Sequence, residues 1–327
     1  MTADTLLESL LTDAVNRRAD LFDVPETNAF RVFNGFYEGA PELCIDKYAD
    51  TAVILRMSKR ESPSEDDIRR MTELCLERVP GVRNVLFKNR FAAEEAVRKG
   101  KLTAGNAPAE CVREWGCDYP VDLRLNKDCG FYLDSALLRK WLLENAAGQR
   151  VLNTFAYTGS LGMAAASGGA SKVTQTDLNP NYLKETAPEI EYIMGDFFRV
   201  TAALRRAERL FDLLILDPPF FANARRSGKV DTANGIAGLI NKIRPLAADG
   251  SRIVVVNNAL FLSGRAFMDQ LEGLVGDYIS IGGRIDVPAS FFGYAAAGSV
   301  KLPADPAPFN HTTKIAVLEV RRKDGRR

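Results

Sequence analysis

The sequence predicts an α/β protein in which a parallel sheet, covered by helices on both faces, follows a small α+β domain. From about Ser135 onward, short apolar runs of strand length alternate with segments of helical periodicity, which is typical of parallel strands joined by helices. At 327 residues, with 46% hydrophobic and 26% charged residues, the chain is long enough for two domains with buried cores. We therefore expect domains at residues 1–117 and 118–327.

The first domain is expected to contain strands and helices in mixed order. Apolar residues at helical spacing predict an amphipathic helix from about Leu6 to Phe22. Further helices are predicted at Pro63–Val79 and Glu94–Lys99, and strands at Phe30–Phe36, Ala52–Met57 and Val82–Lys88, with a turn-rich segment at Glu38–Asp50. A pre-core β-hairpin is expected between Cys111 and Leu133, with Pro120–Arg124 and Gly130–Leu133 as its arms.

The second domain is expected to alternate strands and helices. The predicted helices are Leu137–Asn145, Leu161–Ser167, Val200–Glu208 and Gly235–Leu246. The predicted strands are Arg150–Thr154, Lys172–Thr176, Tyr192–Met194, Leu213–Leu216, Ile253–Val256 and a closing strand at Lys314–Val320. This order favours a sheet whose ligands bind at the carboxyl ends of its strands.

Composition excludes several classes of site. The five cysteines are widely spaced and contain no Cys-x-x-Cys pair, so we expect reduced thiols and no metal centre. His311 is the single histidine, which excludes a multi-histidine metal site and a His-centred nucleophilic triad, and we expect it to be a hydrogen-bonded loop residue.

Hydropathy and charge bear on location and partners. Apolar runs such as Ile253–Val256 are far shorter than the roughly 20 residues that span a bilayer. Asp4, Glu8 and Asp13 interrupt the N-terminal segment, which therefore lacks the pattern of a secretion signal, and a cytoplasmic location is expected. Residues 1–120 carry 17 Lys/Arg against 21 Asp/Glu, whereas residues 121–327 carry 26 against 21. The second half is thus mildly basic, which suits an RNA face and an ordinary solvated surface about equally.

A strand that runs into a glycine-containing turn is the first candidate cofactor motif. Asn153-Thr-Phe155-Ala-Tyr157-Thr158-Gly159 follows an apolar run and precedes an alanine-rich helix. Glycine at such a turn lets a ligand approach the backbone closely. The segment lacks Gly-x-Gly-x-x-Gly and Gly-Lys-Ser/Thr, which disfavours a nicotinamide site and a phosphate loop. A purely structural turn stays open as an alternative.

Two carboxylates follow the next two predicted strands. Asp177 lies 18 residues after Gly159, where it could accept both hydroxyls of an adenosine ribose. Asp196 follows Tyr-Ile-Met-Gly and could meet the adenine amine. Each could instead be the N-cap of a helix.

The most specific motif is Asp217-Pro218-Pro219-Phe220, which follows the apolar run Phe211–Leu216. Two prolines after a buried strand fix an exposed turn, with the Asp217 carboxylate and the Pro218 carbonyl directed outward, toward a cofactor bound at this edge. These acceptors can hold an amino or imino group of a planar base, while Phe220 or Phe221 offers a stacking face. A plain loop is much less favoured once the motif is considered with Gly159, Asp177 and Asp196.

The order of these motifs resembles class I methyltransferases, in particular the bacterial large-subunit ribosomal RNA methyltransferases related to cytosine-C5 methyltransferase I and the guanine-N7 enzyme. The resemblance rests on Phe30–Gly35 and Gly39–Asp50, on Cys129-Gly-Phe131-Tyr132-Leu-Asp134 with Arg139, on Asn153–Gly159, and on Asp217–Asn223. It implies a Rossmann-like seven-stranded domain, S-adenosylmethionine as cofactor and ribosomal RNA, with the large subunit favoured, as substrate. It further implies cofactor contacts from Phe131, Tyr132, Asp134, Asn153, Phe155, Tyr157, Thr158, Gly159, Asp177, Asp196 and Asp217.

The chain departs from this family at several positions. Only 18 residues separate Asp177 from Asp196, where the family has a full helix, and Ser135, Ala136 and Ser160 replace its usual residues. Cytosine-C5 methylation needs a thiolate that adds to the ring, but no cysteine follows Cys129. Asn257 and Asn258 stand where cytosine-C5 members carry a cysteine, so we favour a base nitrogen as the target and assign Asn257 to the catalytic set; an ordinary strand end is the alternative.

Two basic groups could contact phosphate. Arg225, Arg226 and Lys229 follow the Asp-Pro-Pro turn, and Arg321, Arg322, Lys323, Arg326 and Arg327 form the C-terminal tail. The favoured function is thus an RNA base N-methyltransferase without metal. Alternatives are a cytosine-C5 enzyme, a non-catalytic RNA-binding relative, and a methyltransferase of proteins or small molecules. Whether the chain forms a homodimer stays open.

Overall fold

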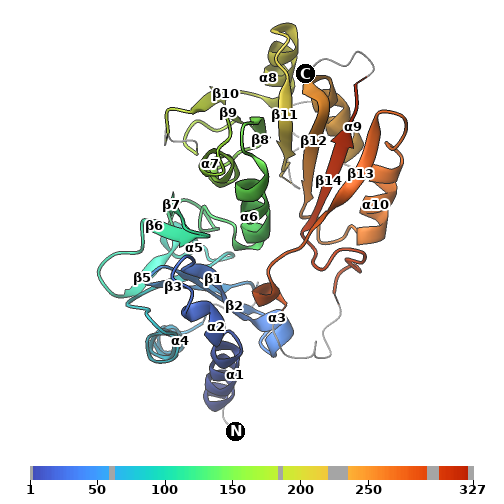
Figure 1. Ribbon diagram of the computed structural model, residues 1–327. Helices are drawn as coiled ribbons and strands as arrows, with labels where there is room; N and C mark the ends of the chain where they lie inside the picture. The colour runs from blue at the N-terminus through green and yellow to red at the C-terminus, as the bar shows by residue number, and fades with distance from the viewer. Residues whose placement is uncertain (1–2, 59–62, 183–186, 220–234, 293–301, 323–327) are drawn as a thin grey trace. The chain divides into compact units, whose positions relative to one another are not determined.

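The computed structural model describes residues 3–58, 63–182, 187–219, 235–292 and 302–322, and the chain divides into two compact units (Figure 1). Unit 1 comprises Met1–Ala136 and Pro288–Lys301, and unit 2 comprises Leu137–Val287 and Leu302–Arg327. The division thus falls later than the expected boundary at residue 118, because the segment after it packs within unit 1. The rings of Tyr119 and Phe131 lie 5.3 Å apart, and the Tyr48 hydroxyl donates to the Phe131 carbonyl at 3.2 Å.

Unit 1 is built on a five-stranded sheet in the order β1-β2-β3-β4-β5. The strands are β1 (Ala29–Asn34), β2 (Leu43–Tyr48), β3 (Thr51–Arg56), β4 (Asn84–Asn89) and β5 (Lys101–Ala104), and only β3 and β4 pair in parallel. The helices are α1 (Ala3–Arg17), α2 (Ala19–Phe22), α3 (Gly35–Glu38), α4 (Glu65–Arg78) and α5 (Glu95–Lys99). Leu11, Phe33, Ile54, Cys75 and Phe87 are among the side chains of its core.

The prediction of a turn-rich segment at Glu38–Asp50 was wrong for Leu43–Tyr48, which forms strand β2. All six residues of β2 are buried, because the strand lies between β1 and β3. Within this strand Asp46 forms a two-pronged ion pair with Arg31 at 2.8 and 3.0 Å. Pairing of this kind compensates the burial of a carboxylate and allows it in a central strand.

The expected pre-core hairpin lies earlier in the chain than predicted. Its strands are β6 (Cys111–Glu114) and β7 (Cys117–Pro120), joined by Trp115 and Gly116, which both have positive φ, as a tight two-residue turn requires. Apart from Pro120, which ends β7, neither predicted arm is a strand. Asp122 accepts from the Arg124 N–H, Asp128 accepts from the Gly130 N–H, and η1 (Leu133–Ser135) is a 3-10 turn. These bonds from side chain to backbone compete with strand pairing.

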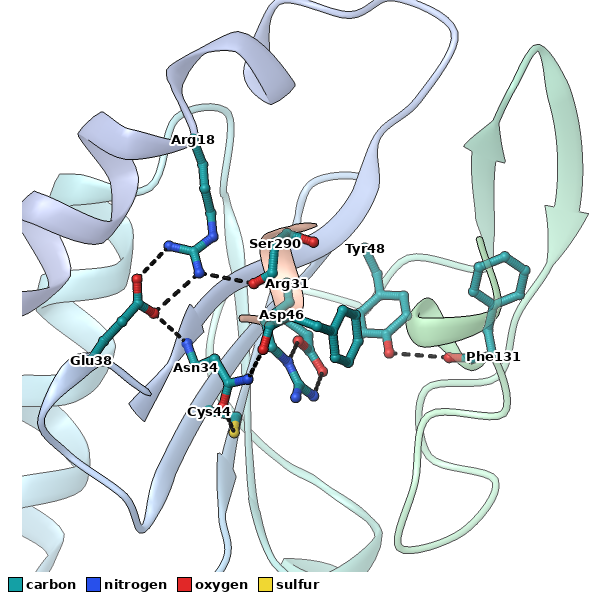
Figure 2. Close-up of polar contacts among 10 residues, drawn as sticks. Arg18, Arg31, Asn34, Glu38, Cys44, Asp46, Tyr48, Phe131 and Ser290 are labelled. Carbon is teal, nitrogen blue, oxygen red and sulfur yellow. Dashed lines mark hydrogen bonds and ion pairs between the residues drawn. The ribbon is translucent and has the colours of Figure 1, made fainter. Parts of the chain in front are cut away.

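A buried ionic network holds the segment after Val287 to unit 1 (Figure 2). The Arg18 guanidinium donates to both Glu38 carboxylate oxygens, at 2.7 and 3.1 Å, and to the Ser290 carbonyl at 2.9 Å. The Glu38 carboxylate also accepts the Asn34 N–H at 2.6 Å. This explains why η3 (Ala289–Phe291), remote in sequence from α1, belongs to the same unit.

Unit 2 contains the predicted parallel sheet, which is confirmed. Its order is β10-β9-β8-β11-β12-β14-β13, with the first five strands parallel and β14 antiparallel to both neighbours. The strands are β8 (Arg150–Thr154), β9 (Lys172–Asp177), β10 (Ile190–Met194), β11 (Phe211–Leu216), β12 (Ala247–Asn257), β13 (Ile279–Ile285) and β14 (Lys314–Val320). The helices are α6 (Ala136–Asn145), α7 (Ser160–Ser167), α8 (Phe197–Arg206), α9 (Gly235–Ile243) and α10 (Gly264–Glu272), with η2 (Arg244–Leu246) after α9.

Helices cover both faces of this sheet. Side chains of α8, α9 and α10 share one core cluster with Leu152, Leu214 and Val255. On the other face α7 packs over β9, and the Arg252 guanidinium of β12 lies 4.8 Å from the Trp141 ring of α6. Central strands enclosed on both sides are continuously apolar, which is why Leu213–Leu216 is fully buried and easy to predict. Among the described residues no helix is long and apolar enough to cross a membrane.

The strand order reverses between β8 and β11. From β8 the chain proceeds outward to β9 and β10, whereas β11 leads to β12 on the opposite side (Figure 1). Loops at the carboxyl ends of such neighbouring strands diverge and leave a crevice where ligands of open α/β sheets bind. The candidate residues can therefore be sought at this edge.

Candidate functional site at the carboxyl edge of the sheet

The strand register brings the predicted turns to one edge of unit 2. Leu216 of β11 pairs with Thr154 of β8 and Val255 of β12, and Thr154 pairs in turn with Thr176 of β9. Asp177 ends β9, Asp196 follows β10 by two residues, and Asp217 follows β11 directly. The carboxylates predicted from strand spacing thus lie along a single edge.

The loop after β8 has a strained backbone. Phe155 and Tyr157 have φ of 55° and 52°, and Gly159 has φ of 87°. Left-handed conformations cost non-glycine residues on the order of 1 kcal/mol each and persist only where the surroundings impose them. Here the Ala156 N–H donates to the Thr176 carbonyl at 2.9 Å, and the Tyr157 N–H donates to the Asp177 carboxylate at 2.9 Å. The loop is therefore held in one shape by the neighbouring strand.

Two buried amides lie beneath this loop. Asn153 is 1% exposed, and its Nδ2 donates to Gln175 Oε1 at 2.9 Å. Within the described residues Asn153 Oδ1 has no hydrogen-bond partner, although it is buried. An unsatisfied buried acceptor costs about 1–3 kcal/mol, and a ligand ammonium or N–H could satisfy it.

Gln175 also explains the glycines, and the sequence prediction missed it. A Cβ on Gly159 would lie 2.8 Å from Gln175 Nε2, and a Cβ on Gly162 would lie 2.4 Å from Gln175 Cδ. The packed amide therefore requires glycine at both positions, and Gly159 is also required by its positive φ and by any ligand that approaches the turn. No local pattern indicates Gln175, because β9, Lys-Val-Thr-Gln-Thr-Asp, is polar at every position except Val173.

Asp177 links three strand ends. One carboxylate oxygen accepts the Tyr157 N–H and the other accepts the Asn179 N–H, both at 2.9 Å, while the Asp177 carbonyl accepts the Gly195 N–H at 2.9 Å. A carboxylate oxygen can accept two hydrogen bonds, so each retains capacity for a ligand hydroxyl. Asp177 therefore fixes the edge and can also bind a ligand there.

Asp196 is the N-cap of α8, the alternative considered from the sequence. Its Oδ1 accepts the N–H groups of Phe198 and Arg199 at 3.0 and 3.3 Å. The cap anchors Phe197, whose ring stacks on Phe155 with centroids 4.8 Å apart and planes at 20°. Both bonds use one oxygen, so the cap and a ligand contact through Oδ2 are compatible.

Exposed apolar side chains accompany these carboxylates and were not predicted. Leu178 is 71% exposed directly after Asp177, and Met194 and Phe198, 41% and 38% exposed, flank Asp196. Their signal in the sequence was an apolar residue within two positions of each acidic one. Carboxylate beside apolar surface suits a ligand with both hydroxyl groups and a flat ring.

The Asp-Pro-Pro turn follows β11 as predicted. Asp217 and Pro218 are half-buried and Pro219 is exposed. Because Leu216 pairs with Val255, Asp217 lies at the level of Val256, one residue before Asn257. Phe220, Phe221, Arg225, Arg226 and Lys229, predicted to contact base or phosphate, lie outside the described residues, as do Lys323, Arg326 and Arg327 of the tail.

Asn257 is the last residue of β12, as the strand-end alternative had it. Its Oδ1 accepts the Ala259 N–H at 3.1 Å, and it pairs across the sheet with Lys314 of β14. Lys314 is fully buried, and its Nζ donates to the carbonyls of Ala259 and Thr312 at 3.0 and 2.5 Å. Burial lowers the pKa of the Lys314 ammonium to about 8.

The predicted pre-core residues belong to unit 1. Phe131 is buried against Tyr119, the Tyr132 hydroxyl donates to the Asp128 carboxylate at 3.1 Å, and Asp134 lies in η1. Their expected contact with a cofactor stays a prediction. Elsewhere, in the ranges the structure describes, no group of three or more His, Cys, Asp or Glu side chains could hold a metal ion.

Comparisons with known proteins show the family to which the chain belongs. Residues 80–258 match the model of a family described as S-adenosylmethionine-dependent methyltransferase. The chain is 31% identical over 288 residues to a ribosomal RNA large subunit methyltransferase of Deinococcus radiodurans, covering 81% of this chain and 69% of that protein. It is 31% identical over 245 residues to ribosomal RNA large subunit methyltransferase K/L of Shewanella amazonensis, covering 71% of this chain but 34% of that protein.

Solved structures share the fold over nearly the whole chain. A methyltransferase complexed with S-adenosylhomocysteine is similar with a TM-score of 0.81 and 23% identity, covering 98% of this chain and 82% of that one. An S-adenosylmethionine-dependent methyltransferase from Streptococcus mutans gives a TM-score of 0.79 at 21% identity, with the same coverage. The chain spans about two thirds of the Deinococcus relative and about one third of the Shewanella relative.

Proposed function

Because the chain belongs to the S-adenosylmethionine-dependent methyltransferase family, we propose that it methylates a nitrogen of a base in large-subunit ribosomal RNA. S-adenosylmethionine is the methyl donor of this family. The RNA substrate is proposed from the names of the relatives, which are ribosomal RNA large subunit methyltransferases. The ring or exocyclic nitrogen is proposed from the chain's own residues.

The residues at the carboxyl edge fit the donor. Asn153 Oδ1, buried and without a partner among the described residues, can accept the ammonium of the methionine part above the strained Phe155–Gly159 loop. Asp177 retains acceptor capacity for the ribose hydroxyls, with the apolar Leu178 beside it. Asp196 Oδ2 can accept the adenine amine. When bound, the donor supplies an electrophilic methyl group on a sulfonium.

The Asp-Pro-Pro turn carries the proposal for the acceptor. Asp217 and the Pro218 carbonyl follow β11 next to the Phe155–Gly159 loop, because Leu216 and Thr154 are register partners. Their oxygens can accept N–H groups from a base and hold its nitrogen lone pair in line with the incoming methyl group. Phe220, predicted to stack on the base, and the phosphate contacts of Arg225, Arg226 and Lys229 remain part of this proposal.

The positions of the cysteines favour nitrogen over cytosine C5. Methylation at that carbon needs a thiolate at the target site. The chain contains Cys44, Cys75, Cys111, Cys117 and Cys129, and no cysteine follows Cys129, so the carboxyl edge from Asp177 to Asn257 carries none. Burial also raises the pKa of the Cys75 and Cys129 thiols to about 12, which disfavours thiolate at neutral pH.

Substitution Asp217→Ala tests the assigned role. It removes the acceptor for the base but not the Asn153, Asp177 or Asp196 contacts, so transfer of labelled methyl groups to stripped ribosomal RNA should fall at least about 100-fold. Calorimetry should find the dissociation constant for S-adenosylmethionine unchanged within a few-fold. Asp277→Ala, which removes an exposed carboxylate before β13, is the matched control and should be silent.

Two results would contradict the proposal. Full activity of the Asp217→Ala protein would remove Asp217 from the reaction. If a parallel assay labelled protein fractions and not RNA, the substrate would be a protein, and the assignment to the methyltransferase family would still hold.

A further inference from the structure

The loop between β12 and α10 presents the most exposed aromatic side chain among the described residues of unit 2. Phe261 is 77% exposed and the adjacent Leu260 is 49% exposed. No aromatic ring in the described ranges contacts Phe261. A single exposed apolar residue is ordinary, but two adjacent ones at a ligand edge are a candidate contact surface.

This loop is held at both ends. At its start the buried Lys314 ammonium donates to the Ala259 carbonyl, and Asn257 Oδ1 accepts the Ala259 N–H. At its end Ser263 Oγ accepts the Ala266 N–H and caps α10, and the Gly264 N–H donates to the Asp305 carbonyl at 2.8 Å. The exposed side chains thus project from a fixed backbone, which lowers the entropy cost of binding.

The loop lies next to the turn assigned to the target base. β12 is parallel to β11 and extends two residues beyond Val255, the register partner of Leu216. Residues 258–262 therefore leave the same edge from the strand adjacent to the one that carries Asp217. Leu178, the other strongly exposed apolar residue of this edge, follows β9 on the far side of β8.

The absence of charged side chains in this loop indicates which class of ligand it could bind. Residues 257–264, Asn-Asn-Ala-Leu-Phe-Leu-Ser-Gly, carry no charged side chain. The nearest cation in sequence, Arg265, is paired with Asp269 and Glu272 of its own helix. A site for phosphate would need unpaired cations, and a site for a basic peptide would need carboxylates. An aromatic ring beside an exposed amide instead suits the face and the edge of an uncharged base.

We propose that Phe261, with Leu260 and Asn258, is a platform on which an unpaired RNA base next to the methylated nucleotide stacks. The Phe261 ring and Leu260 cover the face of the base, and the Asn258 amide meets its edge. This inference rests on the proposed RNA substrate and assigns the residues that position the flanking strand. Phe261 is a specificity and positioning residue, because it contacts neither the methyl donor nor the reacting nitrogen.

The test compares Phe261→Ala and Phe261→Trp in the full chain, with Tyr278→Ala as the control. Tyr278 is 41% exposed and precedes β13 at the opposite edge of the sheet, so its loss should be silent. Large-subunit ribosomal RNA from a strain that lacks the gene is the substrate. Phe261→Ala should raise KM for RNA by roughly 5- to 150-fold, which corresponds to one lost base–aromatic stack. The melting temperature and the dissociation constant for S-adenosylmethionine should not change.

A second aromatic side chain at position 261 distinguishes a stacking role of Phe261 from a structural one. Phe261→Trp should keep KM within about threefold of the wild type, and the fluorescence of the new indole should be quenched by RNA beyond the change seen in the wild type. An unchanged KM in Phe261→Ala, with an active wild type, overturns this inference alone. If the wild type methylates no ribosomal RNA, the proposed function fails and this inference fails with it. A sedimentation coefficient that changes on Phe261→Ala would assign the surface to a second copy of the chain and also overturn it.

Discussion

Residue by residue, the acidic positions of the edge were easier to predict than the amides and the lysine that support them. Asp177 ends a predicted strand, Asp196 follows the next one by two residues and Asp217 directly follows an apolar run, so strand spacing alone indicates their positions. Gln175 lies inside β9 and Lys314 begins β14, and their burial arises from α7 and from the loop after β12. Such partners are remote in sequence, and no local pattern reports them.

Lys314 leads to a prediction about pH. Its pKa is lowered from 10.5 to about 8 by burial, so between these values the unfolded chain binds more protons than the folded one. The folded state therefore gains stability as pH rises from about 8 to 10.5, and this gain is absent below pH 8. The melting temperature of the wild type minus that of Lys314→Met should increase between pH 7.5 and 10. A difference that stays constant or decreases would show that the ammonium is not desolvated.

At the level of elements, enclosed parallel strands were the most predictable part of the fold. The parallel strand β8 matches its predicted bounds, and β11 contains the predicted run Leu213–Leu216, whose continuous apolar sequence needs no further context. The antiparallel strand β14 also matches its predicted bounds. β13 and α10 were not predicted. β13 alternates buried and exposed residues, contains Gly282 and Gly283, and has a register shift between Ile281 and Gly283, so it resembles a loop in sequence.

Gly264 at the start of α10 should tolerate no side chain. A Cβ there would lie 1.7 Å from the Pro306 carbonyl oxygen and 2.5 Å from that of Ala307. These are backbone atoms, so relieving the clash would require a shift of the main chain. Gly264→Ala should destabilise the protein by about 2 kcal/mol or more. Gly238→Ala, in the exposed face of α9 with open space around it, should stabilise by about 0.5–1 kcal/mol.

Chemical denaturation of the two glycine variants checks this pair. Equal midpoints would mean that the contact between the start of α10 and the segment before Phe309 is not formed in solution. A stabilised Gly264→Ala protein would contradict the packing outright.

At the scale of the whole chain, the division into two compact units depends on contacts that sequence patterns do not reveal. The segment that begins at Pro288 belongs to unit 1. The Ser290 carbonyl accepts from the Arg18 guanidinium (Figure 2). The Phe291 ring lies 4.3 Å from the Arg31 guanidinium. These residues are more than 250 positions apart. By contrast, the family and the methyl donor were predicted from short motifs and are confirmed by the comparisons.

We propose that the carboxyl edge of unit 2 directs a methyl group to one base of large-subunit ribosomal RNA. Nucleoside mass spectrometry tests this proposal most directly. The measurement compares large-subunit RNA from the parent strain, from a strain that lacks the gene, and from that strain carrying the wild-type or the Asp217→Ala protein. We predict one N-methylated base that disappears with the gene, returns with the wild type and stays absent with Asp217→Ala. Identical modification profiles in all four samples would contradict the account.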